Sequence, residues 1–271
     1  MPKLTPKAGA VGLLPGQKEA GKRVDFKPDD FTLLVETKGY RLAWSRASFC
    51  PCKPINDQTE QPDPNCPICE GSGWIRFKPE AAVVNTNIIG ELDSLQQAIV
   101  NDNASVIRGI MTGITNTRVP YDQVLPRLEG VMNLTVRHEN KLGYHDRLVN
   151  LDSTIIYSQV IDYDGGALTP LRYPVRYVNL VRSVTQTFTE IGTENPGGDY
   201  HLVDGKIQWA SGKAPPTNER LAVHYLTHPT WRVVEHPHAM RTTPVKYKTT
   251  SKTGDAEPLP VQAVCKLEFM L

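Results

Sequence analysis

Four of the five cysteines lie within twenty residues, in the stretch FCPCKPINDQTEQPDPNCPICEGSGW. Cys50 and Cys52 are separated by one residue, and Cys66 and Cys69 are separated by two. Two short hooks of this kind, joined by a loop, deliver four thiolates to one tetrahedral zinc ion. The spacing therefore predicts a structural Zn²⁺ site with Cys50, Cys52, Cys66 and Cys69 as its ligands.

Three other uses of these cysteines are less consistent with the sequence. A disulfide between Cys50 and Cys52 would be strained, and a reducing cytosol would keep the other thiols free. A redox pair at Cys66 and Cys69 usually begins a helix after a strand, whereas EGSGW follows here and is a poor helix start. A catalytic zinc ion needs an open position for water, and four thiolates leave none.

The residues beside the hooks support a metal-stabilised loop. Gly71 and Gly73 are expected at positive φ, so that backbone N–H groups point at the sulfur atoms. Pro51 and Pro67 restrict the chain directly after the first cysteine of each hook. The loop between the hooks has few apolar residues, and zinc binding, on the order of 10–16 kcal/mol in small zinc peptides, would stabilise it instead. Cys265 lies outside this cluster and is predicted to be a buried strand residue.

The histidines offer a second candidate site. His224, His228, His236 and His238 could bind another metal ion, but no carboxylate accompanies them in a metalloprotease pattern. We expect them instead to pack at strand ends. The sequence contains no G-x-S-x-G, P-loop or G-x-G-x-x-G motif after a strand, so it predicts a protein that is not an enzyme.

The elements that must position these residues are predicted to be mainly strands. The 271 residues include 22 prolines and 20 glycines, which favour short strands separated by turns. FTLLVETKGYRLAWSRASF is expected to form a strand pair, and LDSLQQAIV one or two helical turns. Asp204 and Gly205 separate YHLV from KIQW and predict a hairpin, and PVQAVCKLEFML predicts a final strand. The fold class is therefore mainly β, with short strands, an inserted zinc loop that carries the four clustered cysteines, and an extended N-terminal arm.

We divide the chain into four segments. Residues 1–30 form the extended arm, with plain disorder as the alternative, and residues 31–82 contain strands and the zinc loop. Residues 83–245 form the main β domain or domains, and residues 246–271 form a C-terminal tail that ends in a strand. No apolar run is long enough for a membrane helix, and the N-terminus lacks a signal-peptide pattern. We therefore expect no membrane partner and synthesis in a reducing cytosol.

Two known groups share parts of this pattern. Cys66-Pro67-Ile68-Cys69-Glu70-Gly71-Ser72-Gly73 resembles one C-x-x-C-x-G-x-G unit of the DnaJ-type chaperone zinc domain, which needs four such units. The CPC hook followed by PDPNCPICEGSGW resembles a zinc-binding segment of tailed-bacteriophage head–tail joining proteins. The segments GYHDRLVN, LRYPVRYVNLVRS and DYHLVDGKIQWASGKAPPTNERLAVHYLTHPTWRVVEHPHAMR are similar to the same group.

The second resemblance implies a structural subunit of a phage virion, assembled in the host cytoplasm. A neck or head-to-tail connector protein of this type forms a homo-oligomeric ring around the DNA channel, between portal or adaptor proteins and tail proteins, and could contact the DNA non-specifically. A baseplate position in the same virion is an alternative. A nucleic-acid-binding zinc-ribbon protein is another, suggested by aromatic and basic residues in YRLAWSR and GWIRF, although the net charge is only +1. A zinc hydrolase is the third alternative function.

Overall fold

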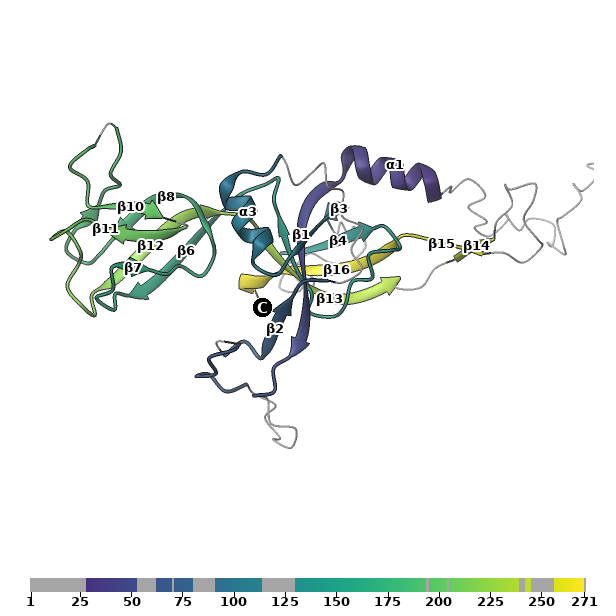
Figure 1. The fold of residues 1–271 in the computed structure, drawn as a ribbon, viewed down its shortest axis with the longest axis horizontal. Coiled ribbons are helices and arrows are strands. Elements are labelled where there is room, and N and C mark those ends of the chain that lie inside the picture. Colours follow the sequence, from purple (N-terminus) through teal and green to yellow (C-terminus); the bar gives the residue numbers. More distant parts are fainter. Residues whose placement is uncertain are drawn as a thin grey trace, which may run out of the picture.

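The computed structural model describes residues 28–52, 62–69, 71–79, 91–113, 130–193, 195–203, 205–238, 242–244 and 256–270. The predicted N-terminal arm lies outside these residues except for its last three positions. The described chain is mainly β, as predicted, and the four clustered cysteines lie in a loop between two of its strands. It forms two lobes, which lie side by side in Figure 1.

The first lobe is a closed barrel. Within the described residues, six antiparallel strands follow one another around it, and β1 closes the ring by pairing with both β3 and β5. In their order around the barrel the strands are β1 (Tyr40–Phe49), β3 (Ser105–Gly113), β4 (Val131–Val136), β16 (Val261–Leu267), β13 (Thr230–His238) and β5 (Arg147–Asn150). Closure gives each of these six strands a described partner on both sides, which protects them from pairing with other strands.

Alternating apolar side chains fill the barrel interior. Met132, Leu134 and Val136 of β4 are buried while their neighbours are partly exposed, which confirms the predicted alternation. Cys265 of β16 has no exposed surface and belongs to the same core, also as predicted. Gly109 of β3 faces this core, where an added methyl group would lie 2.7 Å from Leu134 Cδ1, so the interior has no room for a larger residue.

The predicted strand pair over residues 31–49 is wrong in its first half. Residues Pro28–Lys38 form helix α1, and the chain then enters β1 as a single ten-residue strand. Pro28 suits the first turn of a helix because its missing N–H is not needed there. Asp30 near the start and Lys38 in the last turn match the helix dipole. Figure 1 shows α1 lying across one side of the barrel.

A second helix covers the outside of the barrel near the other lobe. Helix α3 (Ser94–Asn101) confirms the helical turns predicted for LDSLQQAIV. Ile99 packs with Ala43, Val106 and Val149, which point outward from the barrel strands. Successive side chains of β1 point to opposite faces of the sheet, so its inward residues line the barrel while Ala43 contacts this helix.

The second lobe, residues 155–227, is inserted between the adjacent barrel strands β5 and β13. We call it the outer lobe. In the described residues it consists of a sheet ordered β6-β12-β8-β9 and a sheet ordered β10-β11-β7, with a shared apolar core between them. The predicted hairpin around Gly205 is confirmed by the β10–β11 pairing. The bounds are β6 (Ile155–Asp162), β7 (Leu168–Thr169), β8 (Val175–Arg182), β9 (Thr187–Phe188), β10 (Tyr200–Val203), β11 (Lys206–Trp209) and β12 (Arg220–Thr227).

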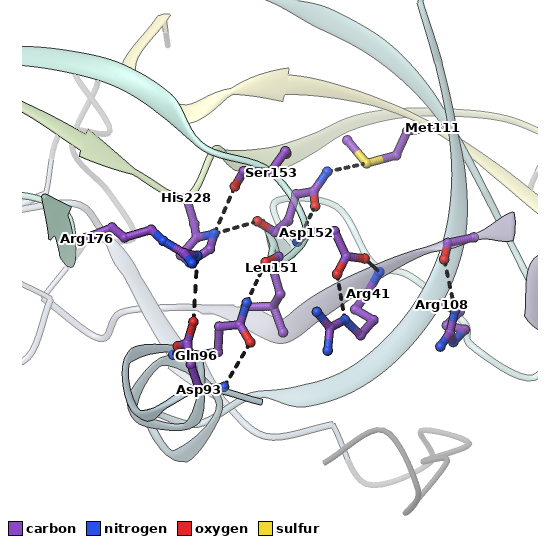
Figure 2. A network of polar contacts seen from close by, with 12 residues as sticks. Arg41, Asp93, Gln96, Arg108, Met111, Leu151, Asp152, Ser153, Arg176 and His228 are labelled. Carbon is purple, nitrogen blue, oxygen red and sulfur yellow. Dashed lines mark hydrogen bonds and ion pairs between the residues drawn. The ribbon is translucent and has the colours of Figure 1, made fainter. Parts of the chain in front are cut away.

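Polar contacts tie the two chain crossings between the lobes together, as Figure 2 shows. His228 Nδ1 lies 3.1 Å from the carbonyl oxygen of Asn150 and 2.9 Å from that of Ser153. Asp152 accepts from both the backbone N–H and the guanidinium of Arg41, at 2.6 and 2.5 Å. His228 therefore connects the segment that leaves the outer lobe to the segment that enters it. Asp152 connects the entering segment to barrel strand β1.

The remaining described elements are short. Strand β2 (Trp74–Phe77) pairs with the far end of β1, and β14 (Thr242–Pro244) pairs with β15 (Ala256–Pro258). A 3₁₀ turn, Glu268–Met270, follows β16. Neither the length nor the hydropathy of any helix in the described part of the chain would let it span a membrane.

Candidate metal centre

The cysteine loop connects β1 to β2 and projects from the barrel, at the bottom of Figure 1. The two strands pair from Arg46 with Phe77 to Phe49 with Trp74, and this hairpin places the first hook directly beyond β1. Trp74 stacks on His145 with ring centroids 4.0 Å apart and contacts Phe49 at 4.5 Å. These ring contacts fix the base of the loop against the barrel.

All four predicted ligands come together at the end of this hairpin. The Sγ atoms lie within 4.8 Å of one another, with 3.7 Å between Cys50 and Cys66 and 3.4 Å between Cys52 and Cys69. Metal–sulfur bonds of about 2.3 Å in a tetrahedron place sulfur atoms about 3.8 Å apart. No disulfide joins them. The four thiols therefore have the spacing of a four-coordinate metal site.

The turn after the second hook has the geometry that the sequence predicted. Gly71 and Gly73 have φ values of +78° and +74°, which an L-residue would adopt only with strain. The backbone N–H of Gly73 donates to Cys69 Sγ at 3.3 Å. The carbonyl oxygen of Gly73 accepts from the N–H of Cys50 at 2.9 Å, so one glycine links the two hooks.

The turn before the second hook depends on a residue that the sequence reasoning missed. The carboxylate of Asp63 accepts a hydrogen bond from the backbone N–H of Asn65 at 2.9 Å. The backbone carbonyl oxygen of Asp63 accepts another from the N–H of Cys66 at 3.1 Å. These two hydrogen bonds fix the direction in which the chain enters the second hook. The signal was present in the stretch PDPN, because aspartate and asparagine beside proline favour this type of turn.

The thiols differ in their acidity. Hydrogen bonds from the backbone N–H groups of Cys69 and Ile68 lower the pKa of Cys66 to about 7. Burial and the neighbouring thiols raise the pKa of Cys52 to about 12. At neutral pH the thiol of Cys66 therefore loses its proton more readily than the thiol of Cys52. A bound cation would favour the thiolate form of all four cysteines.

The surroundings of the sulfur atoms fit a bound metal ion. Cys50, Cys66 and Cys69 are 2%, 5% and 5% exposed, and the small cluster they form contains little apolar surface besides Ile75. Such a cluster buries too little hydrocarbon to hold a loop by itself. The donor set contains only sulfur, which soft or borderline metals such as zinc prefer. A metal ion in this position would saturate its coordination with protein ligands.

The histidines do not gather into a second site of this kind. In the part of the chain that the structure describes, the four cysteines are the group of potential ligands close enough to share an ion. His228 is buried at the junction of the lobes, and His224 is half-buried in β12. His236 contacts the ring of Tyr144 at 4.8 Å, and the side chain of His238 lies outside the described residues.

Comparison with known proteins adds no identification. No family model matches the chain, and no curated protein matches it. The candidate site therefore stands on its own geometry.

Proposed function

We propose that this protein is a non-enzymatic structural subunit of a tailed-phage virion, of the neck or head-to-tail connector type, with a structural Zn²⁺ ion at Cys50, Cys52, Cys66 and Cys69. The approach of four cysteine sulfur atoms to within 4.8 Å of one another carries the proposal. Four thiolates leave no position for substrate or water, so the ion holds a loop in shape.

The location of the site supports a role in assembly. The cysteine loop extends away from the barrel, and Phe49 at its base and Ile68 within it are 64% and 62% exposed. A metal-rigidified loop loses little conformational entropy when a neighbouring subunit packs against it. Exposed apolar side chains on such a loop are therefore suited to an intersubunit contact.

The outer lobe carries a second surface suited to association. One face of the β6-β12-β8 sheet exposes Ile156, Val160, Tyr177 and Leu180, which are 61%, 64%, 56% and 40% exposed. The strand register places Ile156 and Tyr177 on opposite sides of Leu226, so these residues lie on one face. Contiguous exposed apolar surface of this kind is typical of protein interfaces. We assign it to contact with the next copy in a ring.

A ring subunit requires this separation of surfaces. Contacts between different faces of neighbouring copies close into a ring when the rotation between them is regular. The cysteine loop and the outer lobe leave the barrel in different directions in Figure 1, so each subunit presents two distinct surfaces. Repetition around the ring multiplies weak individual contacts.

Replacing one ligand tests the metal's role. Cys66→Ser should lower bound zinc from roughly one ion per chain to a small fraction, because three thiolates bind the ion far more weakly. The matched control is Cys265→Ala, which removes a cysteine outside the cluster and should leave zinc content unchanged. Metal analysis of the purified proteins and hydrogen exchange of residues 62–77 provide the measurements.

The same variants test the structural role. Cys66→Ser should lose protection in the loop and fail to enter particles, while the barrel strands keep their protection. A metal-free variant that remains ordered and is still incorporated into particles would defeat this role for zinc. Steeply salt-dependent retention of the wild-type protein on DNA would instead favour the nucleic-acid-binding alternative.

A further inference from the structure

The junction between the two lobes contains a cavity of about 400 Å³. Ser45 and Arg147 reach it from the barrel, and Arg172, Tyr173 and Lys206 reach it from the outer lobe. Cavities of this size, at the interface of two folded units, are the usual location of small-molecule sites. None of the four clustered cysteines lines it, so any ligand here is separate from the metal.

The charges around the cavity are predominantly positive. Arg147, Arg172 and Lys206 line it, and Asp102 is the acidic residue among the lining side chains. Glu268 pairs with Arg147 at 3.2 Å but also with Arg76 and Arg232, at 3.5 and 3.0 Å. One carboxylate shared by three guanidinium groups cannot neutralise Arg147. The cavity therefore has an excess of about two positive charges at neutral pH.

Two hydrogen-bond donors in this region lack partners among the described residues. The hydroxyl of Tyr173 has none, although Tyr173 is only 3% exposed. The Nε of Arg147 lies near Glu268 but without the alignment of a hydrogen bond. Burial raises the pKa of Tyr173 to about 12, so its hydroxyl remains a donor at neutral pH. A buried donor without an acceptor is costly, and an anionic oxygen would satisfy it.

We propose that this interlobe cavity binds a small phosphate-bearing anion, with Arg147 contributed by the barrel and Arg172, Tyr173 and Lys206 contributed by the outer lobe. The excess of two positive charges matches a compact dianion. Guanidinium and hydroxyl donors are the groups that commonly bind phosphate oxygens. Because its contacts come from both lobes, the ligand would also fix the outer lobe relative to the barrel.

The first test is calorimetric titration of the full chain with inorganic phosphate, and separately with pyrophosphate, at constant ionic strength. We expect saturable binding near one ion per chain and a rise in the unfolding temperature with phosphate concentration. Succinate is the comparison dianion, because its two charges are spread over separate carboxylates. Binding of succinate as tight as that of phosphate would overturn the phosphate class, and the absence of phosphate binding would overturn the site.

Variants show whether this cavity is the place of binding. Arg172→Gln and Tyr173→Phe should each weaken phosphate binding by roughly tenfold or more, because each removes a donor to the anion. The matched control, Arg182→Gln, removes an exposed arginine of the same lobe that does not line the cavity. Arg172 is exposed, so its replacement should leave the fold intact. Phosphate binding that is unchanged in Arg172→Gln and Tyr173→Phe would overturn the proposal.

Discussion

Glu268 shows how one residue can organise charges from distant parts of the chain. Its carboxylate is 12% exposed and lies between Arg76 of β2, Arg147 of β5 and Arg232 of β13. It directly follows β16, so it connects the end of the described chain to three other strands. Removing a buried carboxylate leaves its partners as uncompensated buried charges.

At the residue scale we therefore predict that Glu268→Gln lowers the free energy of unfolding by about 3 kcal/mol, because three guanidinium groups lose their shared anion. Urea unfolding of the purified protein measures the change. Asp162→Asn is the matched control. It breaks the Asp162–Arg220 ion pair, whose side chains are 65% and 71% exposed, and should cost less than about 0.5 kcal/mol. Equal losses for the two variants would contradict this account.

Acid should remove the same contribution from the wild-type protein. Burial alone would raise the pKa of Glu268, but the nearby Arg147, Arg232 and Arg76 outweigh it and hold the pKa below its usual value of 4.5. Stabilisation by such a carboxylate is present above pH 4.5 and is lost as the pH falls through the lowered pKa. The difference between wild type and Glu268→Gln should therefore shrink as the pH is lowered below 4.5.

At the scale of elements, the short helix α3 depends on its N-terminal cap. Asp93 accepts from the backbone N–H of Gln96 at 2.8 Å, and the Gln96 side chain accepts from the N–H of Asp93 at 3.1 Å. The Gln96 amide also donates to the carbonyl oxygen of Leu151 at 2.7 Å, beside the chain crossing between the lobes in Figure 2. The cap thus positions a helix that supports the junction.

We predict that Asp93→Ala destabilises the protein by about 1 kcal/mol, because the cap is lost. Asp93→Asn should cost much less, since asparagine is an equally good capping residue. The asparagine variant also removes the charge paired with Arg176 at 3.6 Å, but both side chains are nearly half exposed and this pair contributes little. Thermal unfolding separates the two variants. A similar loss in both would assign the effect to the ion pair instead.

At the scale of the whole molecule, the outer lobe is attached through two adjacent chain crossings and presents its apolar sheet face away from its own core. Ile156 and Val160 alternate along β6 with the partly buried residues that contact the core. Their exposure serves no contact within the described chain. This is the face that the proposed ring contact would bury.

From the proposed ring assembly we predict that the double variant Ile156→Glu and Val160→Glu remains folded but stays monomeric under conditions in which the wild type associates, because charged side chains oppose burial of this face. Light scattering across a concentration series measures the assembly, and circular dichroism reports the fold. Thr112→Glu, at an exposed position on the barrel strand β3, is the control and should assemble as the wild type does. Normal assembly of the double variant would exclude this face from the contact.

The sequence predicted some elements well and missed others for physical reasons. The alternation at Met132, Leu134 and Val136 predicted a strand because one face of each strand is buried. The error at residues 31–38 arose because FTLLVETK carries apolar and β-branched residues that suit either state. Pro28, three residues before this segment, is the first residue of the helix, where its missing N–H is tolerated, and Leu33 and Leu34 remain exposed on the helix.

The cysteine cluster could be predicted from the sequence, since its four thiols lie in two local hooks and its turns use glycine, proline and aspartate. Sulfur chemistry fixes the number of ligands, and the short chain between the hooks fixes which sulfur atoms can meet. The closed barrel, the inserted outer lobe and the interlobe cavity depend on pairings between strands that are far apart in the chain, such as β5 with β13, and on contacts such as Arg41 with Asp152, 111 positions apart. No local pattern encodes such pairings, because they follow from how all the strands pack around a shared core.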